Sequence, residues 1–371
     1  NSSSVRQFKK VQGFTPFLPG FGRASFLGGY MGIYLDSGYV NWPDIFVRGS
    51  TFNVSWGPRG GGKTFGALQY FIDNELPFIM LRRTSKIVER IQRPMLSPLV
   101  PLNEKLYKEN PLRFETDGDG MTAILDSHDN FRGMLMSLVD VASIRGFSAP
   151  WCKWIFYDEY AKEKHERRIT GESDAIFNAY ETINRNRELE GEDPVRMLFC
   201  SNSETLQNPV FLGFNIIADA ERLLKSDGQE VLTIKDRSIT LVNFKYSPIA
   251  DRKKDTALYK ATKGTRFFDM AIENHFALTP DSNRKSENLK EYKLIATLGK
   301  LNIYRHKSAK RVYVCTTKVG RAPEFATDII SINRFRQQYP WFWGAYVDGF
   351  VIFEDLYSES LLTSYFGVDI M

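Results

Sequence analysis

The residues from Gly57 to Thr64 carry the clearest chemistry in this sequence. They read Gly-Pro-Arg-Gly-Gly-Gly-Lys-Thr and fit the pattern G-x-x-x-x-G-K-[ST]. Glycines let backbone N–H groups curl around a phosphate, the lysine reaches the β- and γ-phosphates, and the threonine hydroxyl ligates Mg²⁺. The pattern therefore predicts an ATP-binding loop with Thr64 as a metal ligand. The loop consists of Gly57, Pro58, Arg59, Gly60, Gly61, Gly62, Lys63 and Thr64.

A second set of chemical groups follows the apolar run Trp151–Tyr157, which ends in Asp158 and Glu159. A P-loop ATPase needs such an acidic pair well downstream of its glycine loop. The first carboxylate, Asp158, would hold Mg²⁺ through water, and the second, Glu159, would orient and polarise the attacking water. An apolar run before Asp-Glu is common, so this prediction depends on its pairing with the glycine loop.

The segments around the glycine loop are those that the motif requires. Thr51–Trp56 alternates and is rich in β-branched and aromatic residues, which predicts a strand. The residues after the loop, Phe65 to Asn74, place apolar side chains at helical spacing on one face: Leu68, Phe71 and Ile72. A plain glycine-rich turn is the alternative, and the order strand, loop, helix argues against it.

Short apolar runs recur along the chain and alternate with helical segments. The expected strands include Pro77–Leu81, Met134–Val139, Trp151–Tyr157 and Val195–Cys200, and a helix is expected over Asp174–Arg187. This alternation predicts an α/β fold with a doubly wound, mostly parallel sheet and a ligand at the carboxyl ends of the strands. Ser201 and Asn202 follow the strand expected beside the Asp-Glu strand, where they could sense the γ-phosphate.

A chain of 371 residues suggests two or three domains. We expect an N-terminal arm over 1–50, a P-loop ATPase domain over 51–250, a basic linker or lid over 251–285, and a small C-terminal α/β domain over 286–371. In the last domain we expect strands and then helices at Tyr292–Leu298, Leu301–His306, Val312–Thr316, Asp328–Gln337 and Glu354–Phe366.

Composition limits the class of protein. The net charge of +5 is too small to indicate nucleic acid binding alone, but Lys300–Arg321 has seven Lys or Arg and no acid, whereas Ala322–Met371 has two Arg against seven acids. This asymmetry indicates two different partners or a polar arrangement of repeated subunits, although a solvated face is an equal alternative. Three distant cysteines favour a reducing compartment. No apolar run approaches the ~18 residues of a membrane span.

The order of motifs resembles a known family, the DNA-packaging ATPases of tailed bacteriophages, or large terminase subunits. It is most similar to the short packaging ATPases of small podophages with protein-primed genomes. The segments that carry the resemblance are Gly57–Thr64, Leu81–Thr84, Ile155–Glu159, Arg185–Glu188, Leu198–Asn202 and Asn208-Pro209, with weaker likeness over Lys254–Phe276 and Ala345–Glu354. The family implies a P-loop NTPase of the ASCE type. Residues 1–50 match nothing in it.

The resemblance implies a role for each matching residue. It implies that Glu159 and Lys63 are catalytic and that Arg59 contacts the γ-phosphate or communicates within its own subunit. Thr64 and Asp158 bind or assist Mg²⁺, while Ser201 and Asn202 couple hydrolysis to movement.

The family also completes each site with basic residues from a neighbouring subunit, and Arg185 and Arg145 match two such positions. A positive charge supplied across a subunit boundary stabilises the transition state and makes hydrolysis depend on the neighbour. A surface salt bridge is the alternative for either arginine.

The C-terminal segment departs from full terminases, which carry a nuclease of the RNase H type with a cluster of metal-binding acids. Its first expected strand, Tyr292–Leu298, contains no acid, and Asp348, Glu354 and Asp355 lie near the end of the chain. We therefore expect a degenerate domain without nuclease activity. It would bind DNA, a structural packaging RNA or the viral portal instead, with Lys300–Arg321 as its phosphate-facing surface.

The resemblance implies an ATP- and Mg²⁺-dependent motor that moves double-stranded DNA. It implies a homo-oligomeric ring, expected to be a pentamer, that docks transiently on the procapsid in the host cytoplasm and is absent from the mature virion. Candidate DNA-phosphate contacts are Arg83, Lys86, Arg90, Arg93, Lys307, Lys310 and Arg311. The alternatives are a terminase with an active nuclease, a P-loop small-molecule kinase and a non-catalytic nucleotide-binding scaffold.

Overall fold

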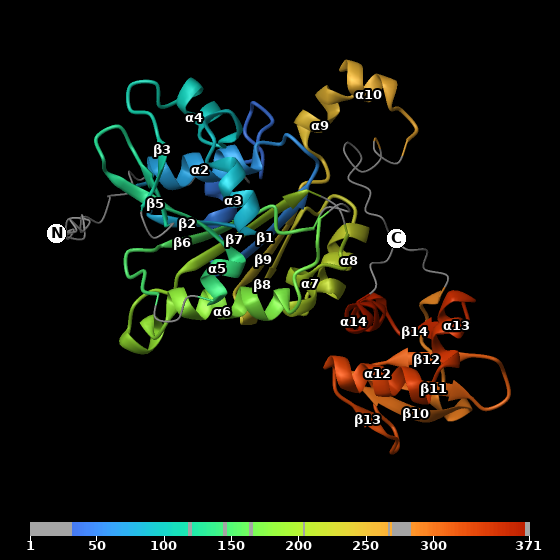
Figure 1. Cartoon of the computed structure of the whole chain (residues 1–371). Coiled ribbons are helices and arrows are strands. Elements are labelled where there is room, and N and C mark those ends of the chain that lie inside the picture. The colour runs from blue at the N-terminus through green and yellow to red at the C-terminus, as the bar shows by residue number, and fades with distance from the viewer. Residues whose placement is uncertain are drawn as a thin grey trace, which may run out of the picture. The chain divides into compact units, whose positions relative to one another are not determined.

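The structure is a computed structural model that describes residues 32–117, 121–143, 147–162, 166–202, 205–265, 268 and 283–367. Within these residues the strands form two sheets (Figure 1). The first has nine strands in the order β3-β4-β5-β2-β6-β7-β1-β9-β8. Its strands are β1 (Phe52–Gly57), β2 (Phe78–Arg82), β3 (Arg113–Thr116), β4 (Thr122–Leu125), β5 (Phe131–Ser137), β6 (Trp154–Asp158), β7 (Arg196–Asn202), β8 (Val231–Ile234) and β9 (Ile239–Asn243).

The centre of this large sheet is parallel, because β5, β2, β6, β7, β1 and β9 all run in one direction. Antiparallel strands flank it, β3 and β4 at one edge and β8 at the other. The predicted mostly parallel sheet is confirmed, as is the predicted pairing of the Asp-Glu strand β6 with β7. The sequence did not indicate that β7 separates β6 from the glycine-loop strand β1, or that β9 pairs with β1.

Helices cover both faces of the large sheet, which makes it doubly wound (Figure 1). One apolar cluster joins the sheet to α1, α2, α3 and α4, and the other joins it to α5, α6, α7 and α8. These helices are α1 (Trp42–Phe46), α2 (Lys63–Asp73), α3 (Ser85–Ile91), α4 (Val100–Lys105), α5 (Leu138–Ser143), α6 (Glu172–Asn184), α7 (Pro209–Gly213) and α8 (Ile217–Lys225).

The apolar spacing of α2 shows how the sequence produces this packing. Leu68, Phe71 and Ile72 recur at helical spacing, and all three are buried in an apolar cluster with residues of β2, β6, β7 and β9. The helix begins at Lys63, directly after Gly62, whose positive φ of 79° favours glycine. The predicted strand, glycine loop and helix are therefore confirmed, and they fix the direction in which the loop faces.

The short helix α1 precedes the glycine loop in the chain. Trp42 is buried, stacks on Phe46, and donates a hydrogen bond from Nε1 to the Lys63 carbonyl at 3.0 Å. Its place is thus in the core under α2. The rest of the expected arm, residues 1–31, lies outside the described residues, and the domain boundaries stay a prediction.

After β9, the chain forms the short helices α9 (Pro248–Lys253) and α10 (Ala257–Ala261) within the region predicted as a linker or lid. The second sheet has five strands in the order β13-β10-β11-β12-β14. Its elements are β10 (Tyr292–Leu298), β11 (Leu301–His306), β12 (Val312–Cys315), β13 (Glu324–Phe325), β14 (Val351–Phe353), α12 (Ile329–Gln338), α13 (Trp341–Val347) and α14 (Leu356–Phe366). The first three strands agree with the prediction, whereas α13, β13 and β14 had no predicted counterpart.

Candidate active site

The glycine loop joins β1 to α2 at the carboxyl end of the parallel strands. Gly60 and Gly62 have φ near 80° and 79°, a region that residues with side chains rarely adopt. Lys63 is buried, and its ammonium donates to the carbonyls of Gly57 at 3.1 Å and Pro58 at 2.7 Å. Burial lowers the pKa of Lys63 to about 8, because a low-dielectric environment disfavours the charged form. The predicted lysine thus lies inside the loop that it is expected to serve.

The structure brings together the two residues predicted to ligate the metal. The Thr64 hydroxyl donates to Asp158 Oδ1 at 2.9 Å, joining the start of α2 to the end of β6. Asp158 is buried. A hydroxyl and a carboxylate are both hard oxygen ligands, which is the donor type that Mg²⁺ prefers. The donor set therefore fits Mg²⁺ at this position.

Arg82 belongs to the Leu81–Thr84 segment that carries the resemblance, but no role in the site was predicted for it from the sequence. Its guanidinium donates through one nitrogen to Asp158 and through the other to Glu159 Oε2 at 2.7 Å. The register explains the contact: Leu81 lies beside Tyr157 in the parallel strands, so the next residues, Arg82 and Asp158, are neighbours too. One buried cation therefore holds both acids of the motif.

Glu159 has an unusual backbone. Its φ is 55°, which is uncommon for a residue with a side chain, and its N–H donates to the Cys200 carbonyl at 2.7 Å. Its side chain is 59% exposed, whereas that of Asp158 is 4% exposed. The two acids thus occupy different environments, because Asp158 is buried against Thr64 and Glu159 is largely exposed to solvent. Left-handed backbone at such a position is typical of functional sites.

Strand β7 contributes the polar pair predicted to sense the nucleotide. The oxygen Oδ1 of Asn202 lies 3.5 Å from the Lys63 ammonium, and Ser201 Oγ accepts a hydrogen bond from the Ala161 N–H at 3.3 Å. Both serve as connections between β7 and its neighbours, one toward the glycine loop and one toward the Asp-Glu motif. A cavity of about 30 Å³ is lined by Arg82, Arg83, Ile87, Asp158, Glu159, Ala161, Glu166, Ser201 and Asn202.

Two predicted arginines are not brought to this cavity. Arg59 is exposed at the crest of the glycine loop. Arg185 follows the end of α6, is exposed, and donates from its guanidinium to the Phe147 carbonyl at 2.5 Å. Its φ of 51° directs the chain out of the helix. Arg145 lies outside the described residues.

Arg83 corrects one of the predictions. Its side chain is 1% exposed, and it pairs with both oxygens of Glu172 at 2.8 Å and with Glu166 at 2.8 Å. Burial alone would lower the pKa of Arg83, but these carboxylates outweigh it and raise the pKa. Arg83 directly follows the last residue of β2, and it lines the same cavity as Arg82 but pairs with different acids. An arginine buried and paired in this way does not contact DNA.

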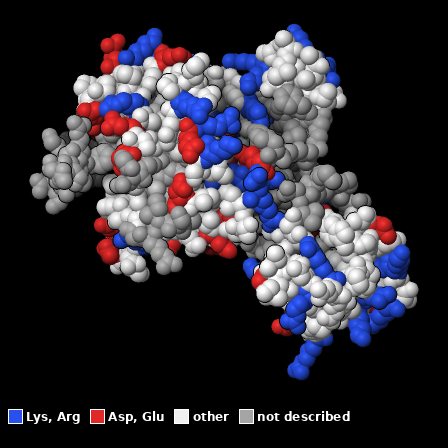
Figure 2. Space-filling view, viewed as in Figure 1, with Lys and Arg blue, Asp and Glu red and all other residues white. Residues whose placement is uncertain are grey.

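The other predicted phosphate contacts are exposed: Lys86, Arg90, Arg93, Lys307, Lys310 and Arg311. The first three lie on or just after α3, and the last three surround the turn between β11 and β12. Basic side chains gather over the second sheet on the face shown in Figure 2. Their solvent exposure leaves them able to meet a polyanion.

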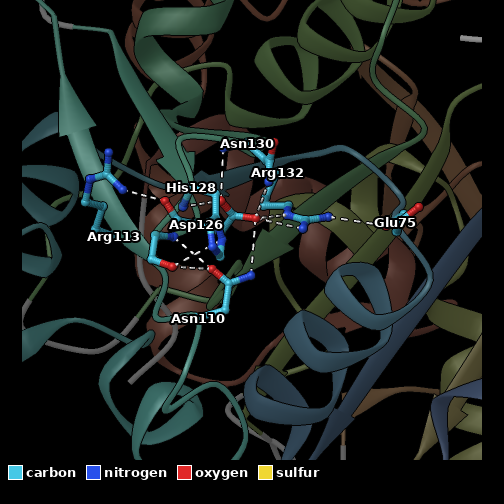
Figure 3. Close-up of polar contacts among 8 residues, drawn as sticks. Glu75, Asn110, Arg113, Asp126, His128, Asn130 and Arg132 are labelled. Carbon is cyan, nitrogen blue, oxygen red and sulfur yellow. Dashed lines mark hydrogen bonds and ion pairs between the residues drawn. The ribbon is translucent and has the colours of Figure 1, made fainter.

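A separate polar cluster surrounds Asp126 at the end of β4 (Figure 3). Asp126 is buried and accepts hydrogen bonds from the backbone of His128 and Asn130 and from the Arg132 guanidinium at 2.8 Å. Burial would raise the pKa of Asp126, but these bonds lower it. Its side chain also accepts a hydrogen bond from Asn110 at 3.4 Å, so Asp126 stabilises the turn between β4 and β5 and joins it to the segment before β3.

Metal clusters and membrane helices are both absent from the part of the chain that the structure describes. No group of three or more His, Cys, Asp or Glu side chains there is arranged to hold a metal ion. In the same residues, each helix lacks either the length or the apolar character needed to cross a membrane.

Comparisons with known proteins agree with this geometry. Residues 35–294 match the family model of the podovirus DNA encapsidation protein, Gp16. The DNA packaging proteins of Bacillus phages PZA and phi29 are each 26% identical over 231 residues, so the alignment spans 60% of this chain and 61% of each relative. A chain of the bacteriophage Phi-29 viral genome packaging motor assembly has a TM-score of 0.61 at 15% identity, and the match covers 89% of this chain and 98% of that chain. The likeness shows a shared P-loop fold.

Proposed function

This chain belongs to the podovirus DNA encapsidation protein family, and from that membership we propose that it is an ATPase that drives double-stranded viral DNA into a preformed capsid. One observation carries the proposal: Lys63, Thr64 and Asp158 meet where β1 and β6 end on either side of β7, at the edge where a P-loop enzyme binds its triphosphate. The family supplies the DNA-packaging context, and the site supplies the chemistry.

In this proposal the backbone of the glycine loop and Lys63 bind the β- and γ-phosphates of ATP. Thr64 and Asp158 hold Mg²⁺, which neutralises charge on the phosphates when bound. Glu159 orients the attacking water and accepts its proton, and its exposed carboxylate has access to solvent for that task. Arg82 is a positioning residue, because it holds both carboxylates of the motif at once.

We propose that a neighbouring subunit completes each site with an arginine, and Arg185 is the described candidate. Its exposure outside the cavity supports this role, since a residue that acts on another subunit must lie at the surface of its own. Arg145 remains the second candidate. The arrangement requires a ring of identical subunits, which we expect to be a pentamer, docked on the procapsid portal in the host cytoplasm, with a structural RNA as a possible part of the platform.

We further propose that Ser201 and Asn202 couple hydrolysis to movement. Strand β7 lies between the strand that carries the glycine loop and the strand that carries the Asp-Glu motif. A displacement of either neighbouring strand would therefore change the position of Asn202. Exposed basic side chains then grip the DNA backbone without reading bases. The C-terminal sheet serves in this proposal as a binding domain without nuclease activity.

One pair of assays tests the proposal. ATP hydrolysis is measured with and without double-stranded DNA, and DNA cleavage is measured with Mg²⁺ or Mn²⁺ in parallel, with Lys63→Ala as the control for contaminating ATPase. We expect hydrolysis that DNA stimulates, and intact DNA. Hydrolysis indifferent to DNA would favour a small-molecule kinase, and metal-dependent cleavage would favour a terminase with an active nuclease.

A further inference from the structure

A second lysine reaches the glycine loop from a distant part of the chain. Lys253, the last residue of α9, donates a hydrogen bond from its ammonium to the Arg59 carbonyl at 2.7 Å. The ammonium lies against the loop so closely that a β-carbon added to Gly60 would collide with it. Lys253 therefore fills the space that a side chain at position 60 would need.

The position of Lys253 is fixed by several contacts of the segment that carries it. Ser247, directly before α9, is buried and lies 3.6 Å from the place of a β-carbon on Gly61. Arg252 donates to the Ser37 carbonyl at 3.2 Å. The segment around Ser37 is in turn joined to the loop, because the Val40 N–H donates to the Gly61 carbonyl at 3.2 Å. Contacts at both ends of α9 thus hold the helix against the loop, directly and through the segment around Ser37.

The charges around the loop are arranged for an anion. The ammonium of Lys63 donates to the carbonyls of Gly57 and Pro58, the ammonium of Lys253 donates to the carbonyl of Arg59, and Arg59 is itself part of the loop. Burial lowers the pKa of Lys253. The Asp158 carboxylate is already engaged by Arg82 and Thr64. Three cations gathered at one glycine loop repel one another, and a polyphosphate offsets that repulsion.

We propose that Lys253 is a phosphate-binding residue of the nucleotide site, acting beside Lys63 on the phosphate chain. This inference rests on the proposed function, since it takes the glycine loop as the place where ATP binds. It assigns to the start of the 251–285 region a direct contact with the nucleotide. A lysine binds phosphate as a point charge. The Lys253 ammonium therefore needs only to be charged and to reach the phosphate.

A structural role is the competing explanation, in which Lys253 only holds the Arg59 carbonyl. Glutamine separates the two roles, because its amide can still donate to that carbonyl but carries no charge. Arginine restores the charge. Lys254 provides the matched control: it is the next residue, and it pairs with Asp251 at the surface at 2.8 Å.

The experiment measures binding of ATP and of inorganic tripolyphosphate to the full chain by titration calorimetry. Variants Lys253→Gln, Lys253→Arg and Lys254→Gln are compared with the unchanged protein, and kcat and KM for ATP are measured alongside. We expect Lys253→Gln to weaken both ligands about tenfold, as the loss of one charge-assisted hydrogen bond predicts. KM should rise with kcat little changed, Lys253→Arg should recover most of the affinity, and Lys254→Gln should bind normally.

Three results would overturn the inference: normal binding by Lys253→Gln, an equal loss in the Gln and Arg variants, or a loss confined to ATP. Each leaves the proposed function intact, provided that Lys63→Ala still abolishes binding. If the unchanged protein and Lys63→Ala bind ATP equally, the proposed function fails and this inference fails with it.

Discussion

The two sheets of this protein place their charged residues in different ways. In the large sheet, β2, β6, β7 and β1 are adjacent and parallel, so their carboxyl ends deliver Arg82, Asp158, Asn202 and the glycine loop to one edge. In the small sheet, β10, β11 and β12 are antiparallel neighbours, so successive strand ends fall on opposite edges. Polar groups converge at one edge of the first sheet and are spread over the exterior of the second.

A pair of glutamates shows what this difference teaches. Glu159 and Glu354 each follow directly after a buried strand. Glu159 lies beside Asp158 and pairs with Arg82, whereas Glu354 accepts hydrogen bonds from the backbone and hydroxyl of Thr316 at 3.1 and 3.2 Å. A glutamate in the same position after a strand is thus the proposed catalytic carboxylate in one sheet and a loop connection in the other. Topology, rather than local sequence, decides between these roles.

The largest expected effect on ATP turnover compares an exposed arginine after α6 with an exposed arginine on α12 of the small domain. We expect Arg185→Ala to lower ATP turnover by about 10³-fold or more while ATP still binds, because an arginine supplied across a subunit boundary stabilises the transition state. Arg334→Ala, an exposed change on α12 of the small domain, should leave turnover unchanged. Steady-state hydrolysis and nucleotide binding measure both. Mixing Arg185→Ala with Glu159→Gln subunits should restore some activity, and no rescue at any ratio would remove the trans assignment.

The next effect compares the two glutamates directly. We expect Glu159→Gln to lower turnover by about 10²- to 10⁴-fold with ATP binding retained, because the amide cannot accept the proton of the attacking water. Glu354→Gln should retain full turnover, since the Glu354 side chain holds the loop at Thr316 rather than a reacting group. Single-turnover hydrolysis measures each variant. Equal losses in both would mean that the second sheet also takes part in the chemistry.

Much of the candidate active site could be predicted from the sequence because its parts are local. The glycine loop is a contiguous pattern, Asp158 and Glu159 follow an apolar run, and Ser201 and Asn202 follow another. The order of strands was partly accessible too, since the pairing of the Asp-Glu strand with its neighbour was expected and is confirmed.

Long-range partners could not be predicted in this way. Arg82 and Arg83 are adjacent in a basic segment, and the sequence does not indicate which acids each of them meets. The answer depends on the register of β2 against β6, and on Glu172, which pairs with Arg83 from 89 positions along the chain. Lys253 was missed for the same reason, because its contact with Arg59 spans 194 positions.

A smaller effect concerns the pH dependence of nucleotide binding, which should follow the buried lysine of the glycine loop. Burial lowers the pKa of Lys63 to about 8 in the free protein, whereas bound phosphate stabilises the ammonium and raises that pKa. Binding above pH 8 therefore takes up a proton, so nucleotide affinity is full below that pH and falls above it, by up to about tenfold per pH unit.

Titration calorimetry between pH 6.5 and 9.5 measures this profile in buffers of different ionisation enthalpy. The terminal phosphate, with a pKa of about 6, is already ionised over the falling part of the range. Lys63→Arg cannot lose its proton and should give a flat profile even if its affinity is lower. A profile that falls equally in both proteins would assign the titration to another group.

The smallest effect concerns the basic surface of the second sheet. Lys307, Lys310 and Arg311 are exposed around the turn between β11 and β12. We expect their joint replacement by alanine to weaken DNA binding and to reduce the slope of log affinity against log salt by about 0.9 for each DNA phosphate that the variant no longer neutralises. ATP hydrolysis without DNA should not change, because the candidate active site lies at the edge of the large sheet where its parallel strands end. The matched triple replacement of Lys86, Arg90 and Arg93 places the same loss of charge near that edge. If only this second variant changes the slope, the DNA contacts belong to the large sheet, and the basic surface of the small one serves a different polyanion or none.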